Sequence, residues 1–185
     1  MSGSTMSPDS TDTMTNKTIN TSSNTISIVE ADISDLGTYL TATDFGVGFH
    51  AVRTSTQSIS NATLTGVIFN LEDGTRGSND ANGDHNSSTG VYTCTKTGKY
   101  NISGMVQFAE NATGRRVILI YHEGASIGQV SWAGTSNTDT NSHFFSYNHI
   151  VITATDTVVV NVYQTSGGSL NVVTANFGIS WAGPA

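Results

Sequence analysis

The segment 78–89, SNDANGDHNSST, places oxygen-bearing side chains at the spacing of a calcium-binding EF-hand loop. Asp80, Asn82 and Asp84 fall on positions 3, 5 and 7 of such a loop, with Gly83 at position 6. Its two ends, however, carry serine and threonine instead of the carboxylates that supply most of the ligand charge. The pattern therefore favours a series of polar turns, and we expect no bound metal or cofactor.

Histidines are the next residues that could act as ligands or bases. They are His50, His85, His122, His143 and His149. None forms the helical His-x-x-x-His pair of a metal site, and the sequence has no Gly-rich loop followed by Lys and Ser or Thr that would bind phosphate. Asp73, His85 and a serine could be arranged as a triad, but serine is so abundant that this combination has little meaning. We therefore expect a protein that is not an enzyme.

The composition restricts the partners. Of 185 residues only 11% are charged, against roughly 25% in typical proteins, and the net charge is −7. A negative chain lacks the basic footprint of nucleic-acid binding and is repelled by anionic membranes. No segment is long and apolar enough for membrane insertion, and the first residues lack the features of a signal peptide. The single cysteine, Cys94, is expected to be a small strand side chain.

The chain divides into three parts. Residues 1–28, half of them Ser or Thr, suit an extended attachment arm that becomes ordered by adding to a neighbour's sheet. Residues 29–47 suit a connector with a short helix that begins near Asp32 or Ser34 and ends at Tyr39. Residues 48–185 form the head. The arm residues expected to contact a capsid are Thr11, Thr15, Ile19, Ile26 and Ile28.

The head is predicted to be all β, because short strands recur with Gly and Asn turns between them. In 99–109 apolar and polar residues alternate, which places Tyr100, Ile102, Val106 and Phe108 on one face. Gly104 interrupts that face and indicates a bulge or close packing. Both faces of 116–122 are apolar, as expected where one face meets the core and the other meets a partner.

Five pieces of the head, in order, resemble the C1q/tumour-necrosis-factor-like family of jelly rolls. They are 49-FHAVRT-54, 66-GVIFN-70, 89-TGVYTCTKTGKYNISGMVQF-108, 149-HIVITATDTVVVNVYQ-164 and 177-FGISWAG-183. The sequence departs from the family pattern at Thr155, where glycine is usual, and at Gly178, which comes one position early. The resemblance covers about residues 48 to 183 and implies an antiparallel ten-strand jelly-roll sandwich.

The resemblance also implies a compact homotrimer whose protomers pack through apolar strand faces. The residues expected at this trimer interface are Val117, Leu119, Tyr121, Tyr100, Phe177 and Trp181. Arg115 and Arg116, the one paired basic cluster, are expected to pair with acidic residues across a subunit boundary.

A second resemblance lies outside the head, where 29-VEADISDLGTYLTA-42 is similar to connectors of tailed-phage fibre proteins. Together these features favour a virion structural protein of a tailed phage, a homotrimeric capsid decoration or head-fibre protein bound to the major capsid protein or another virion protein. The alternative is the receptor-binding tip of a tail fibre or baseplate that recognises host surface glycans. Its predicted contact residues are Trp132, Asn82 and Asp84.

Overall fold

The computed structural model describes residues 48–72, 83–136 and 141–185. The predicted arm with its five capsid-contact residues, and the connector with its short helix, lie outside the described residues. The described strands are β1 (Gly48–Arg53), β2 (Gln57–Ile59), β3 (Thr65–Gly66), β4 (Leu71–Glu72), β5 (His85–Asn86), β6 (Val91–Thr93), β7 (Gly98–Phe108), β8 (Asn111–His122), β9 (Ala125–Thr135), β10 (Ser142–Ile152), β11 (Thr157–Gln164) and β12 (Leu170–Gly183).

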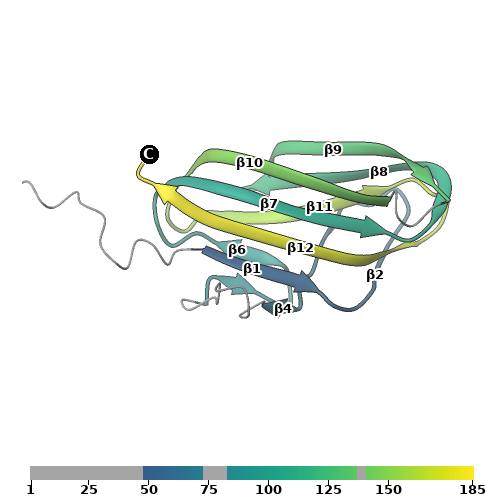
Figure 1. Cartoon of the computed structure of the whole chain (residues 1–185), viewed down its shortest axis with the longest axis horizontal. Coiled ribbons are helices and arrows are strands. Elements are labelled where there is room, and N and C mark those ends of the chain that lie inside the picture. Colours follow the sequence, from purple (N-terminus) through teal and green to yellow (C-terminus); the bar gives the residue numbers. More distant parts are fainter. Residues whose placement is uncertain (1–47, 73–82, 137–140) are drawn as a thin grey trace, which may run out of the picture. The chain divides into compact units, whose positions relative to one another are not determined.

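These strands form two antiparallel sheets packed face to face (Figure 1). The first sheet has the order β10-β7-β12-β1-β4, and β2 also pairs with β12. The second has the order β5-β6-β11-β8-β9, and β3 also pairs with β11. The predicted antiparallel jelly-roll sandwich is therefore confirmed. The strand count exceeds ten because β2 to β5 are pairings of only two or three residues, too short to show a period in the sequence.

The core lies between the sheets and follows the alternation read from the sequence. In β7 the side chains of Tyr100, Ile102, Val106 and Phe108 are all fully buried, as predicted. Gly104 falls on the same face, and a Cβ atom there would overlap the ring of Phe145 on the paired strand β10. The break in the apolar pattern at Gly104 therefore reflects close packing, because the Phe145 ring from the neighbouring strand fills the space that a side chain would occupy.

Two Thr-Gly turns place the strands on either side of Cys94. Gly90 has a φ of 75°, and a side chain there would collide with the carbonyl of Val67. At the second turn the Tyr100 hydroxyl donates to the Lys96 carbonyl oxygen at 2.7 Å and accepts from the Lys96 N–H at 3.3 Å. The tyrosine that begins the long alternating strand thus also closes the turn before it.

Strand β8 is apolar on both faces, as predicted. Ile118 and Ile120 point into the core and are fully buried. Val117, Leu119 and Tyr121 alternate with them and therefore point away from the core. That a partner covers this outer face stays a prediction.

Candidate functional site

The titratable side chains are distributed over the head. Among the residues in the three described ranges, no group of three or more His, Cys, Asp or Glu could hold a metal ion. His85 stacks on Phe49 with ring centroids 4.5 Å apart. His122 Nε2, at the end of β8, lies 2.8 Å from the Asp156 carboxylate in the turn that connects β10 to β11. Both histidines thus have structural contacts.

In the described part of the chain no helix has the length and apolarity needed to cross a membrane.

Cys94 directly follows β6 and is 1% exposed. Burial, followed by the charges of Asp156 and Asp84, raises the pKa of its thiol to about 12. A thiol that stays protonated is a poor nucleophile. The expectation of a small packed side chain is confirmed, although its place is just after the strand.

Two of the predicted receptor-contact residues, Trp132 and Asp84, lie in the described part of the chain and contact the head itself. Trp132 lies within β9 instead of a loop, packs against the core and stacks on His143 at a centroid distance of 3.5 Å. Asp84 is only 9% exposed, and its carboxylate accepts a hydrogen bond from the Thr95 hydroxyl at 3.3 Å. The expected loop position of Trp132 is therefore wrong, whereas contact of Trp132 or Asp84 with a receptor stays a prediction. Asn82 lies outside the described residues.

The residues predicted at a trimer interface fall in three places. Tyr100 and Phe177 are fully buried in the core of their own protomer, so this part of the prediction is wrong. Trp181 is half-buried on β12, and its Nε1 donates to the Thr97 carbonyl oxygen at 3.3 Å. The remaining three residues are those on the outer face of β8.

Arg116 is also placed differently from the prediction. Its side chain is fully buried and donates to the backbone carbonyl oxygens of Asn111, Thr113 and Arg115 at 2.8, 3.0 and 3.1 Å. These hydrogen bonds offset the cost of burying a guanidinium. Arg116 therefore cannot pair with a carboxylate of another subunit, whereas the neighbouring Arg115 is exposed.

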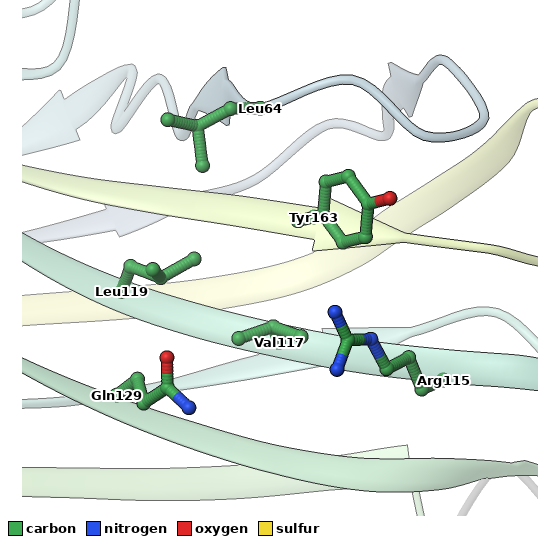
Figure 2. Close-up of a pocket in the computed structure, with 6 residues that line it drawn as sticks. All are labelled: Leu64, Arg115, Val117, Leu119, Gln129 and Tyr163. Carbon is green, nitrogen blue, oxygen red and sulfur yellow. The ribbon is translucent and has the colours of Figure 1, made fainter.

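Arg115 borders a hollow of about 170 Å³ on the outside of the second sheet. We call this surface the β8 face and define it by the residues that line the hollow: Leu64, Arg115, Val117, Leu119, Gln129 and Tyr163. Figure 2 shows the three β8 side chains in a row between Tyr163 and Gln129 of the flanking strands, with Arg115 at one end. The Arg115 guanidinium carbon lies 5.7 Å from the centroid of the Tyr163 ring.

A second hollow, of about 340 Å³, lies on the outside of the first sheet. We call this surface the β10 face; its residues are His50, Ser103, Gly104, Phe144, Phe145, Ser146 and Asn176. Phe144 is 74% exposed. It was missed from the sequence, although two adjacent aromatics on a strand must point to opposite faces of the sheet.

Comparison with known proteins gave structural matches only. No protein-family model matches the sequence, and no curated protein does. Among solved structures, Eiger TNF from S. frugiperda matches with a TM-score of 0.55 and 14% identity over 75% of this chain and 92% of that one. The PRD1 vertex protein P5 matches with a TM-score of 0.54 and 16% identity over 74% and 97%.

The crystal structure of murine APRIL at pH 5.0 matches with a TM-score of 0.50 and 15% identity, over 72% of this chain and 98% of that one. At such low identities the matches show the architecture alone. The described part of this chain therefore has the TNF-like jelly-roll fold.

Proposed function

We propose that this chain is a virion structural protein whose jelly-roll heads associate as a homotrimer. The observation that carries the proposal is the match to the PRD1 vertex protein P5, which extends over 97% of that chain. The scarcity of charged residues, 11% of the sequence, agrees with a surface that is partly covered by other chains. The function is structural, and no catalytic step is assigned to the protein.

The trimer contact is formed by the β10 face. Phe144 and Val151 are 74% and 56% exposed in the isolated protomer, and both lie on β10, at the edge of the first sheet. In a closed trimer each protomer contacts its two neighbours through different parts of its surface, so a projecting side chain and a hollow that receives it are both needed. The β10 face supplies both. Burying one such phenylalanine contributes about 2 kcal/mol per protomer.

Within this function the chain acts as a capsid decoration or head-fibre protein of a tailed phage. The predicted arm residues bind the capsid, and three arms in one trimer increase the total affinity by avidity. A glycan-binding tip is less favoured, because Trp132 is partly buried against the core and the Asp84 carboxylate accepts a hydrogen bond from the Thr95 hydroxyl.

Particles purified by density gradient from the virus that encodes this chain provide the test. Quantitative mass spectrometry should find the protein in intact particles, at a copy number that is a multiple of three. Absence from particles that contain the other structural proteins would overturn the proposal. A copy number of a few trimers per particle, in the tail fraction, would favour the receptor-binding alternative.

A further inference from the structure

The β8 face lies on the opposite side of the sandwich from the β10 face, because the two belong to the outer surfaces of different sheets. A trimer formed through the β10 face leaves the β8 face uncovered. An interaction at the β8 face would go beyond the proposed function, and the residues of this face indicate what kind of partner it binds.

Apolar and aromatic side chains dominate the β8 face. Leu64 is 45% exposed, and Leu119, Tyr163 and the largely buried Val117, which is 5% exposed, line the hollow beside it. Tyr121 continues the row along β8. Tyrosine and arginine are enriched where protein interfaces have their strongest contacts, whereas lysine, aspartate and glutamate are depleted. This composition fits a protein partner.

The size of the hollow supports the same partner. At about 170 Å³ it is smaller than the roughly 300–1,000 Å³ of typical small-molecule sites. A hollow of this size accommodates a side chain of an approaching polypeptide. It is too shallow to enclose a small molecule on most sides.

Arg115 specifies the charge of the partner. Its guanidinium lies over Tyr163, and no ion pair joins it to a carboxylate anywhere in the described ranges. An arginine side chain that already lies against an aromatic ring loses less conformational entropy when it binds a partner. Its planar guanidinium can donate two parallel hydrogen bonds to one carboxylate. The partner must therefore bring an acidic group to this end of the hollow.

We propose that the β8 face docks an extended segment of another protein, with two apolar side chains and a carboxylate at alternate positions. Leu119, Val117 and Arg115 are two residues apart along β8, which corresponds to about 6.6–6.8 Å per step in a strand. Apolar, apolar and acidic side chains with the same spacing match this row. The same segment with a lysine in place of the acid would meet a like charge.

A pair of synthetic peptides tests this proposal on the full-length protein. The fluorescein-labelled peptide SLTLTES carries leucine, leucine and glutamate at alternate positions, and SLTLTKS is its charge-reversed partner. Fluorescence anisotropy at low ionic strength should show saturable binding of SLTLTES and about fivefold weaker binding of SLTLTKS. Arg115→Glu should reverse this preference, whereas Lys99→Glu, a charge reversal on the first sheet, should leave it unchanged.

Two results would overturn the proposal. One is the absence of saturable SLTLTES binding up to millimolar concentration; the other is an unchanged peptide preference in Arg115→Glu. Sedimentation of Arg115→Glu tests a second copy as the occupant: the variant should keep the mass of the wild type, and its dissociation would mean that the β8 face joins copies of this chain. A wild type that is itself monomeric would refute the trimer without affecting the peptide result.

Discussion

Phe144 and Phe145 are neighbours in the chain, yet Phe144 is 74% exposed whereas Phe145 is 4% exposed. Phe145 fills the space above Gly104 inside the sandwich. Phe144 pairs in register with Met105 and points outward beside the hollow of the β10 face. Two adjacent residues on an edge strand thus contribute one side chain to the core and one to the proposed contact between protomers.

Thr155 carries backbone strain that glycine would remove. Its φ is 78°, in a region that a β-branched residue rarely adopts. We expect Thr155→Gly to raise the free energy of unfolding by about 0.5–1 kcal/mol, because the removed strain exceeds the added entropy of the unfolded chain. Chemical denaturation measures this change. Thr153→Gly, in the same turn but without a positive φ, should destabilise the protein.

The His122–Asp156 pair should make stability depend on acidity. The hydrogen bond from His122, followed by that from the Thr153 N–H, lowers the pKa of Asp156 below its usual value of 3.8. A depressed pKa in the folded state contributes stability above the unfolded pKa, and this stability is lost as pH falls through the folded pKa. Asp156→Asn should therefore lower the melting temperature at neutral pH and reduce its decline below pH 3.8.

Thermal unfolding monitored by circular dichroism between neutral and strongly acidic pH measures this dependence. Glu123→Gln is a suitable control, because Glu123 accepts hydrogen bonds from Thr157 at the same end of the sandwich. Identical acid profiles for Asp156→Asn and the wild type would show that this carboxylate does not contribute.

Cys94 should be unreactive in the folded protein. Its side chain is 1% exposed, and burial keeps its pKa at about 12, so little thiolate forms at neutral pH. A thiol reagent such as dithionitrobenzoate should modify it only after unfolding in guanidinium chloride. Stoichiometric modification of the native protein within minutes would contradict the packing described for this residue.

Sequence periodicity predicted the alternation within a long strand such as β7, but not what covers each face of the strand. The alternation in β7 correctly grouped Tyr100, Ile102, Val106 and Phe108 on one face. The sequence nevertheless predicts Tyr100 and Phe177 at the trimer interface, because an apolar strand face has the same pattern whether a second sheet or a second protomer covers it. Only the packing of the two sheets resolves this ambiguity.

Trp132 was misplaced for a different reason. Glycine, serine and asparagine surround it in the sequence, which is typical of a loop. In β9 the neighbouring Gly128 is instead needed for close packing, because a Cβ there would overlap the Tyr147 ring, and Gly134 lies against Arg116. Contacts between residues distant in sequence determine this strand, and the local composition does not contain that information.

Sedimentation equilibrium of the full-length protein with two single variants tests the central claim most directly. The wild type should have a mass of about 58 kDa, three times the 19.4 kDa chain. Phe144→Asp should reduce the mass to that of one chain, whereas Phe144→Leu and Leu119→Asp should leave the trimer intact, with unchanged circular dichroism spectra throughout. A monomeric wild type, or a trimer that survives Phe144→Asp and dissociates in Leu119→Asp, would contradict the assignment of the trimer contact to the β10 face.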